Sequence, residues 1–223
     1  MKPRIGLFGG SFDPVHLGHL LVARAACEEL SLDRLYFIPA AQSPFKLTQM
    51  PAPGSERLRL LRLALAGQTE YEVDPQELIR AGLSFTIDTA RDYAQRFPGS
   101  ELFYLLGADH VAQLPKWREA ATLAELVQFV IIPRPPGSEP PRALVEAAHA
   151  SLEVEIEFPT AVSTAAIPSF RIQMLKGFPL ALSSSQIRQR VRAGLSIDSL
   201  VPPEVAEAIR NNRLYLSAEQ GHH

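Results

Sequence analysis

The fold is constrained most strongly by one stretch near the N-terminus, G-G-S-F-D-P-V-H-L-G-H at residues 9–19. It follows a short apolar run at residues 5–8, which is typical of a parallel strand covered on both faces. It leads into apolar residues at the three-and-four spacing of an amphipathic helix, at positions 17, 20, 21 and 25. The sequence therefore predicts a strand, a glycine turn and a helix in direct succession. The free N–H groups at such a helix start attract anions.

Two histidines stand at the start of this predicted helix. His16 and His19 are three residues apart, so we expect their side chains on one face, near the free N–H groups. Neither of two common phosphate-binding patterns, G-x-G-x-x-G and G-x-x-x-x-G-K-[ST], can be read from Gly9 onward. An imidazolium is disfavoured near a helix N-terminus, but a bound polyphosphate favours it. The pair is therefore suited to binding phosphate and to gaining positive charge as it does so.

Gly18 lies between these histidines. A glycine within a helix costs about 1 kcal/mol relative to alanine. We expect this cost to be offset because the missing side chain lets a ligand approach the backbone.

The rest of the chain alternates predicted strands and helices, which predicts an α/β fold with a Rossmann-like, doubly wound, mainly parallel sheet, flanking helices and a small helical C-terminal part. Between residues 135 and 181 the pattern indicates only a short helix at 143–150, a strand at 153–157 and loops. The expected strands are residues 34–39, 71–74, 102–106 and 127–132. The expected helices are 56–66, with Ser55 as its cap; a helix that opens at 84–89 and ends at 97–99; 184–193; and 203–212. A short packed tail is expected at 214–216.

Ligands of an open parallel sheet bind at the carboxyl ends of its strands. Four predicted strand ends are followed by residues suited to a binding site, namely 9–19, 39–46, 107–109 and 133–134. We therefore expect a single site where these four segments meet.

Length and composition exclude several classes of protein. A chain of 223 residues is long enough for one domain, 1–223, in which residues 183–216 form the helical C-terminal portion. Its formal charge of −2 and lack of charge runs argue against binding nucleic acid polymers or acidic membranes. Cys27 is the only cysteine and is expected to be a small buried hydrophobe, which fits a reducing compartment. With no apolar signal segment and no run of transmembrane length, we expect a cytoplasmic protein.

A second hydroxyl-rich segment, S-S-S-Q-I-R at residues 183–188, opens a predicted helix. Taken alone it is a helix-capping signal. Its hydroxyls and helix start are also suited to phosphate oxygens, and Arg188 can clamp them with its planar guanidinium. Arg190 and Arg192 are expected to be solvated helix charges.

Residues 9–19 resemble the G-G-[ST]-F-D-P-x-H-x-G-H signature of the nucleotidyltransferases that move AMP from ATP to a phosphate acceptor. The H-x-G-H part is also similar to the H-I-G-H element of class I aminoacyl-tRNA synthetases. Residues 183–188 resemble the family's second signature, [IL]-S-S-[ST]-x-I-R, with Ser185 in place of the commoner threonine. The resemblance implies that ATP is bound by Gly9, Gly10, Ser11, Phe12, His16, His19, Gly107, Asp109, Arg134, Ser184, Ser185 and Arg188.

The middle of the chain resembles the branch that uses nicotinate mononucleotide, the bacterial nicotinate-nucleotide adenylyltransferases. The resemblance runs almost end to end, whereas relatives that adenylylate phosphopantetheine are usually shorter and lack the S-[YF]-T-x-D-T and P-x-W pieces. The matching pieces are 38–39 with 44–46, 84–89, 106–109, 114–117, and 194–197 with 200–202.

This resemblance implies roles on the acceptor side. Trp117 would stack on the nicotinate ring, the backbone around Phe85 and Thr86 would recognise its carboxylate, and Asp109 would bind nucleotide hydroxyls. A core tryptophan, a helix-capping threonine and a turn aspartate stay open as alternatives. Phe45 replaces the histidine of the family's usual P-P-H-K or P-P-H-R. The implied mononucleotide-binding set is Ser11, Lys46, Phe85, Thr86, Asp109 and Trp117.

The implied reaction needs placement and charge more than acid–base chemistry. A mononucleotide phosphate is mostly dianionic at neutral pH and attacks the α-phosphorus of ATP in line, so pyrophosphate leaves. His16, His19, Lys46 and Arg188 are the expected catalytic residues. Because no carboxylate cluster suggests a protein metal site, Mg²⁺ is expected to arrive with ATP. Three alternatives stay open: another acceptor (nicotinamide mononucleotide or phosphopantetheine), a non-catalytic nucleotide-binding regulator, and assembly as a homo-oligomer.

Overall fold

The structure is a computed structural model that describes residues 2–42, 50–133, 154–156, 170–176 and 182–216. Its centre is a sheet whose described strands run in the order β3-β2-β1-β4-β5-β7-β6. All neighbouring pairs are parallel except β6 with β7. The strands are β1 Arg4–Gly10, β2 Arg34–Pro39, β3 Tyr71–Val73, β4 Glu101–Gly107, β5 Gln128–Ile132, β6 Val154–Ile156 and β7 Phe170–Met174.

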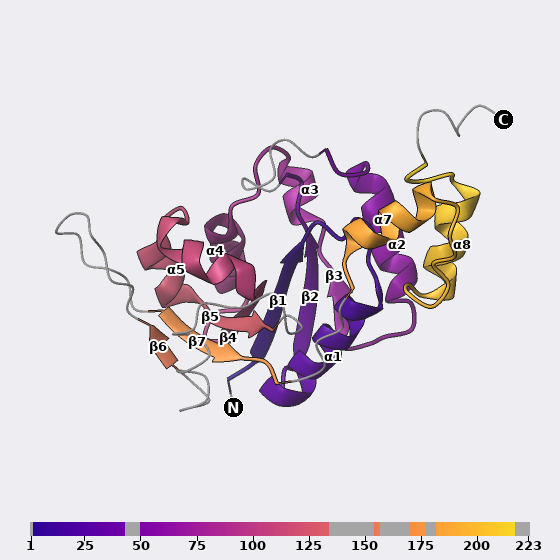
Figure 1. Ribbon diagram of the computed structural model, residues 1–223. Coiled ribbons are helices and arrows are strands. Elements are labelled where there is room, and N and C mark those ends of the chain that lie inside the picture. The colour runs from indigo at the N-terminus through magenta and orange to yellow at the C-terminus, as the bar shows by residue number, and fades with distance from the viewer. Residues whose placement is uncertain (1, 43–49, 134–153, 157–169, 177–181, 217–223) are drawn as a thin grey trace.

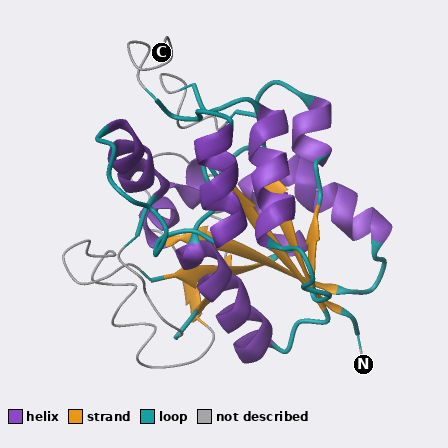
Figure 2. Ribbon diagram, turned by 90° about the vertical axis from the view of Figure 1, so that its right-hand side faces the viewer, coloured by secondary structure: helices purple, strands orange, loops and turns teal. Residues whose placement is uncertain are grey.

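Helices cover both faces of this sheet (Figures 1 and 2). Figure 1 shows α4 and α5 on one side and α1, α2 and α8 on the other. None of the helices in the described part of the chain has the length and apolar character needed to cross a bilayer. The helices are α1 Leu17–Leu30, α2 Gly54–Ala64, α3 Gln76–Arg80, α4 Thr86–Arg96, the 3₁₀ helix η1 Ala108–Lys116, α5 Ala120–Leu126, α7 Ser184–Arg192 and α8 Pro203–Asn211.

Alternate residues of the central strands pack into two separate hydrophobic clusters, one on each face. In β2, Leu35 and Phe37 join the cluster that contains residues of α1, α2 and α8. Tyr36 and Ile38, which point the other way, join the cluster with residues of α4, α5 and η1. This two-sided burial explains why the strands read as continuous apolar runs in the sequence.

The strand order reverses between β1 and β4. From β1 the chain moves outward to β2 and β3, then returns to place β4 on the other side of β1. Such a reversal opens a crevice at the carboxyl ends of the two central strands, which is where ligands bind in this class of sheet. The predicted α/β fold with a doubly wound, mainly parallel sheet is confirmed.

Helix α2 differs from the prediction. Its cap is Pro53, and Ser55 lies inside the first turn, so the predicted capping role of Ser55 is wrong. The helix ends at Ala64, before the predicted stop at Gly67. Gly54 is the first helical residue, and a Cβ there would lie 2.8 Å from a methyl group of Leu78 on α3, so a side chain at this position would displace that methyl group.

Several elements carried no recognisable signal. The five residues of α3 are too few to show a periodic pattern. The 3₁₀ helix η1 contains Pro115, and its three-residue repeat differs from that of an α-helix. The short α5 and the strand β7 were also not predicted, whereas a strand was expected where β6 lies. The predicted helix at 143–150 lies outside the described residues.

Two smaller expectations about packing hold. Cys27 is half-buried against the α1-side cluster, and burial raises the pKa of its thiol to about 11, so it is unreactive at neutral pH. Leu214 and Tyr215, after α8, pack on the same cluster as a short tail.

Candidate active site

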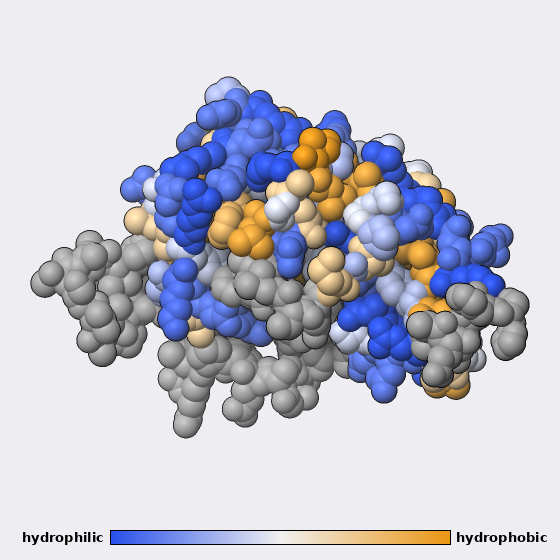
Figure 3. All heavy atoms as spheres, turned by 90° about the horizontal axis from the view of Figure 1, so that it is seen from above, coloured by the Kyte–Doolittle hydropathy of each residue, from blue (hydrophilic) through white to orange (hydrophobic). Residues whose placement is uncertain are grey.

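A cavity of about 1090 Å³ lies at the carboxyl ends of the central strands. Figure 3 views the molecule from above Figure 1, the side toward which β1 and β2 point, and shows apolar side chains gathered between hydrophilic margins. Residues from all four predicted strand ends line the cavity, together with the start of α7. The described residues of these four segments thus meet at one cavity, where a single site was expected.

The β1–α1 loop forms one wall of the cavity. His16 is the N-cap residue of α1, and its backbone N–H donates to Nδ1 of His19 at 3.2 Å. The two imidazole rings are stacked, with centroids 3.7 Å apart. Because Nδ1 of neutral His19 accepts a hydrogen bond, its proton is on Nε2. Nε2–H of His19 is thus a donor that a phosphate oxygen can use.

Both histidines are held neutral at pH 7 in the free protein. Burial lowers the pKa of His16 from its usual 6.5 to about 4. Burial, and then the neighbouring His16, lower the pKa of His19 well below its usual value. Nδ1 of His16 has no hydrogen-bond partner among the described residues. An arriving anion would supply the missing partner and favour the charged form.

Gly18 makes room for the His16 ring, and the predicted approach of a ligand to its backbone stays a prediction. A Cβ at this position would lie 3.0 Å from both Cε1 and Nδ1 of His16. The space left by the absent side chain is therefore filled by the His16 ring, which could not fold over the first turn of α1 if residue 18 had a side chain.

The aromatic core supports the histidines from beneath. Phe12 is 1 % exposed and contacts His19 edge-to-face, with centroids 5.0 Å apart. The ring of Phe8 meets His19 in a similar way at 5.9 Å. These contacts fix the His19 ring, which is also stacked on His16, at the cavity wall.

The start of α7 forms the adjoining wall. Ser183 caps the helix, since its hydroxyl accepts from the N–H of Gln186 at 3.3 Å and its own N–H donates to the Gln186 side chain. The hydroxyl of Ser184 donates to the carbonyl of Pro14 at 2.8 Å. This contact joins α7 to the β1–α1 loop.

Arg188 lies in the same cavity as the two histidines. Its guanidinium donates to the carbonyl oxygen of Asp13 at 2.6 Å and to the hydroxyl of Ser185 at 3.2 Å. It also lies 3.6 Å from the Asp13 carboxylate. Arg188 is thus held at the cavity wall by internal oxygen atoms that a phosphate could replace.

Arg57, on α2, is a structural support of the site that was not predicted from the sequence. It is 1 % exposed and donates to the carbonyls of Ser11, Ala40 and Ala52 at 2.7–2.9 Å. Burial lowers its pKa and nearby Asp13 raises it, but a guanidinium stays charged in proteins. A signal for it did exist, because Arg57 precedes Leu60 and Leu61 by three and four residues, on the apolar stripe of the helix.

The side of the cavity away from the histidines is formed by α4 and the end of η1. Trp117 is half-buried and contacts Tyr104 and Phe129 edge-to-face, so it contributes to the core and to the cavity wall at once. Phe85 is the N-cap residue of α4 and provides no side-chain cap. Thr86 is the first helical residue, so the alternative that it caps the helix is wrong; its hydroxyl donates to that of Tyr104 at 3.3 Å.

Asp109 lies in the first turn of η1 and lines the cavity with Gly107. Of the predicted residues, Lys46 and Arg134 lie outside the described part of the chain. Among the residues that are described, no group of three His, Cys, Asp or Glu side chains could hold a metal ion. The predicted site residues that line the cavity are Gly9, Gly10, Ser11, Phe12, His16, His19, Phe85, Thr86, Gly107, Asp109, Trp117, Ser184, Ser185 and Arg188.

Sequence comparison finds close relatives over nearly the whole chain. The model of the cytidylyltransferase-like family matches residues 7–190. A protein of Opitutus terrae named probable nicotinate-nucleotide adenylyltransferase is 38% identical over 212 residues, which are 95% of this chain and 97% of that protein. A protein of the same name from Gemmatimonas aurantiaca is also 38% identical, over 98% of this chain and 95% of its own.

Comparison with solved structures supports the fold independently. Nicotinic acid mononucleotide adenylyltransferase of Plasmodium falciparum, complexed with NaAD, superposes with a TM-score of 0.70 at 15% identity, covering 96% of this chain and 98% of that one. The same enzyme complexed with APC gives a TM-score of 0.68. At this low identity the likeness concerns the fold alone.

Proposed function

The chain belongs to the cytidylyltransferase-like family, and from this membership we propose that it transfers AMP from ATP to nicotinate mononucleotide, giving deamido-NAD and pyrophosphate. The observation that carries the proposal is a single cavity bordered at one end by His16, His19 and Arg188 and at the other by the start of α4 and Trp117. Such a cavity suits two nucleotides that must meet at their phosphates.

The histidine end is our candidate for the triphosphate of ATP. His16 and His19 are neutral when the site is free, so the empty site does not have to bury two positive charges. They gain positive charge as the polyanion binds. Arg188 exchanges its contacts with Asp13 for phosphate oxygens. The hydroxyl of Ser185 and the helix start beside it add neutral donors.

The α4 end is our candidate for the mononucleotide. The uncapped N-terminus of α4 is suited to the nicotinate carboxylate, and the half-buried face of Trp117 to the pyridine ring. Asp109 is suited to hydrogen bonds from ribose hydroxyls. Lys46 and Arg134, whose positions are outside the described residues, remain proposals drawn from the family resemblance.

In the proposed step, a phosphate oxygen of the mononucleotide forms a bond to the α-phosphorus of ATP, and the bond from that phosphorus to the β-phosphate bridging oxygen breaks. Pyrophosphate carries away the electron pair, and no proton transfer is needed because the attacking phosphate is already ionised. The chain contributes by holding the two phosphates in line and by stabilising the charge that develops on the leaving oxygens through His19 and Arg188.

The side chains around the triphosphate end are imidazoles, hydroxyls, the Arg188 guanidinium and the Asp13 carboxylate, which lies beside Arg188; apart from that one carboxylate they suit phosphate oxygens better than Mg²⁺. We propose that Mg²⁺ enters with ATP and that it supplies neutralisation of phosphate charge. We also propose a cytoplasmic location, because a single cysteine fits a reducing compartment.

An assay of pyrophosphate release with ATP and each candidate acceptor tests the function. We expect turnover with nicotinate mononucleotide and formation of deamido-NAD, detected by its mass. Faster turnover with nicotinamide mononucleotide or phosphopantetheine would identify a sibling with another acceptor. ATP binding without pyrophosphate release from any acceptor would contradict the enzyme assignment and favour a regulator.

A further inference from the structure

Glu77, on α3, is a buried carboxylate in the wall of the cavity. It is 5 % exposed and has no ion pair within 4 Å among the described residues. Burying an unpaired carboxylate is expensive unless hydrogen bonds compensate it. The donors that surround Glu77 therefore indicate what this side chain does.

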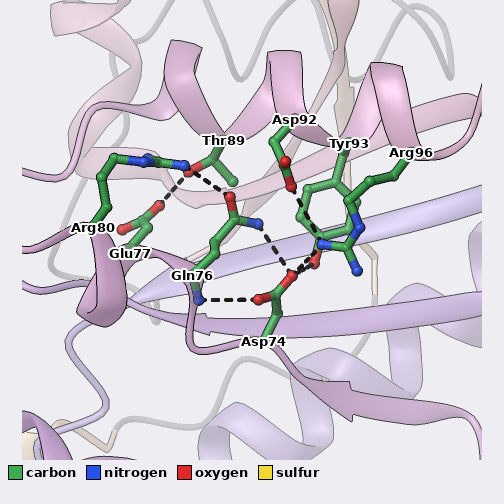
Figure 4. Close-up of polar contacts among 8 residues, drawn as sticks. All are labelled: Asp74, Gln76, Glu77, Arg80, Thr89, Asp92, Tyr93 and Arg96. Atoms are coloured by element: carbon green, nitrogen blue, oxygen red, sulfur yellow. Dashed lines mark hydrogen bonds and ion pairs between the residues drawn. The ribbon is translucent and has the colours of Figure 1, made fainter.

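Those donors come from the two segments on either side of the α4 start. The hydroxyl of Thr89 donates to Oε1 of Glu77 at 2.6 Å, as Figure 4 shows. The hydroxyl of Ser84 also hydrogen-bonds this carboxylate, and both bonds lower its pKa against the larger effect of burial, which raises it. Glu77 thus connects Ser84, just before Phe85 and Thr86, with Thr89, the fourth residue of α4.

Ser84 extends the connection to the end of β2. Its hydroxyl accepts from the N–H of Ala41 at 2.9 Å, and its N–H donates to the carbonyl of Gln42 at 2.9 Å. The hydrogen-bonded chain therefore runs from the β2 end through Ser84 and Glu77 to Thr89. Ser84 and Thr89 lie in sequence on either side of Thr86 and Ile87, the first two residues of α4. The N–H groups of Thr86 and Ile87 have no acceptor among the described residues.

We propose that Glu77 is a positioning residue that holds the first turn of α4 in place for the carboxylate of the mononucleotide. This inference rests on the proposed function, because it concerns the acceptor end of the same cavity. Glu77 acts through Ser84 and Thr89 on the amides and leaves the triphosphate end unaffected. A change in this chain of hydrogen bonds should therefore weaken binding of one substrate and not of the other.

A second network on the same helix supplies a matched control. One turn beyond Thr89, the hydroxyl of Tyr93 donates to Asp74 at 2.7 Å, and Arg96 pairs with the same carboxylate at 2.5 Å (Figure 4). Tyr93 is fully buried, and neither it nor Asp74 lines the cavity. Loss of this second network affects the stability of α4 without affecting its first turn.

Thr89→Val is the principal test, because Thr89 is fully buried and does not line the cavity. We expect KM for nicotinate mononucleotide to rise about tenfold, the effect of losing one hydrogen bond to a charged group, while KM for ATP stays within twofold. Thr89→Ser should restore the wild-type value. Glu77→Gln, which keeps shape but removes the charged acceptor, should give the same split between the two substrates.

Tyr93→Phe should lower the melting temperature and leave both KM values unchanged. The inference is overturned if Thr89→Val raises both KM values equally, changes neither, or has the same effect as Tyr93→Phe. Calorimetric titration of each variant with nicotinate mononucleotide alone separates the two proposals. If the unchanged protein shows no turnover but Thr89→Val still loses binding of nicotinate mononucleotide selectively, the proposed function is contradicted and the inference stands. If the unchanged protein turns over but Thr89→Val shows no selective loss, the function stands and the inference is contradicted.

Discussion

The stacked imidazoles of His16 and His19 show how burial prepares a site for a charged ligand. Phe8 and Phe12 contact His19, and the absent side chain of Gly18 admits the His16 ring. Each contact removes water from an imidazole and so disfavours its charged form. On the proposed function, a triphosphate bound beside these rings reverses this balance, because its negative charge favours the imidazolium forms.

The neutral state of His16 should make stability depend on pH. Its pKa is about 4 when folded and 6.5 when unfolded, so the unfolded chain binds more protons between these values. The contribution of buried, neutral His16 to the free energy of unfolding is therefore fully present above pH 6.5. It is lost as pH falls toward 4, because the unfolded chain then gains a proton that the folded protein does not bind. Between pH 7 and 4.5, urea unfolding should show the parent losing about 2–3 kcal/mol more than His16→Asn. Parallel pH profiles for the two proteins would contradict this.

His19 can be tested with two substitutions that each keep one of its ring nitrogens in function. Asparagine places an acceptor where Nδ1 accepts from the His16 N–H, and glutamine places a donor near the position of Nε2. We expect His19→Asn to fold normally and to lose about 10²–10³ in kcat, and His19→Gln to lose less. Steady-state kinetics and melting temperatures measure this. Equal activity of His19→Asn and the parent would remove His19 from the catalytic step.

At the scale of the elements, α2 supports the site through a single buried side chain. Arg57 holds the carbonyls of three segments, the β1–α1 loop, the end of β2 and the approach to α2 itself. Helix α2 thereby fixes the segments that follow β1 and β2 at the edge of the cavity. Its packing against α8 joins this support to the C-terminal part of the chain.

Replacing Arg57 should destabilise the whole fold. Arg57→Met removes the donor to three partly buried carbonyls from a side chain that is itself fully buried, so we expect the free energy of unfolding to fall by about 3 kcal/mol or more. Arg62→Met, on an exposed position of the same helix, should stay within about 0.5 kcal/mol of the parent. Urea denaturation measures both. Similar midpoints for the two variants would show that the buried hydrogen bonds contribute little.

The elements that could be predicted from the sequence are those with two-sided burial or a repeating pattern. Strands β1, β2, β4 and β5 are continuous apolar runs, and α1, α4, α7 and α8 carry both apolar spacing and stop signals. The residues of α3 and η1 adopt their structure through contacts with the sheet, which a local pattern does not reveal. Ser55 was a plausible cap, but the helix starts two residues earlier than predicted, at Gly54, with Pro53 as its cap.

The same distinction applies to the site. His16, His19 and Arg188 stand in specific motifs, so their meeting in one cavity could be predicted. Glu77 and Arg57 act through hydrogen bonds to residues distant in sequence, and only the fold brings those partners near. The spacing of Arg57 to Leu60 and Leu61 indicates a buried position, but neither residue type nor spacing identifies the oxygen atoms that Arg57 and Glu77 contact.

At the scale of the whole molecule, the phosphate end of the cavity is assembled from two distant parts of the chain. Ser184 and Pro14, which are 170 positions apart, share a hydrogen bond, and Arg188 contacts Asp13. We expect ATP to slow amide hydrogen exchange at residues 9–19 and 183–188 together. Mass spectrometry after proteolysis resolves both segments. Protection of only one of them would show that the two parts do not bind the same ligand.

The contact between Ser184 and Pro14 also bears on how the protein is made. A growing polypeptide on the ribosome produces the histidine segment first and must finish nearly all of its translation before the arginine segment emerges. On the proposed function, a nucleotide gains its full affinity only when both segments are present, so substrate does not guide the early stages of folding. The nascent N-terminal half must reach its arrangement unaided, and cellular ATP can stabilise only a protein whose synthesis is almost finished.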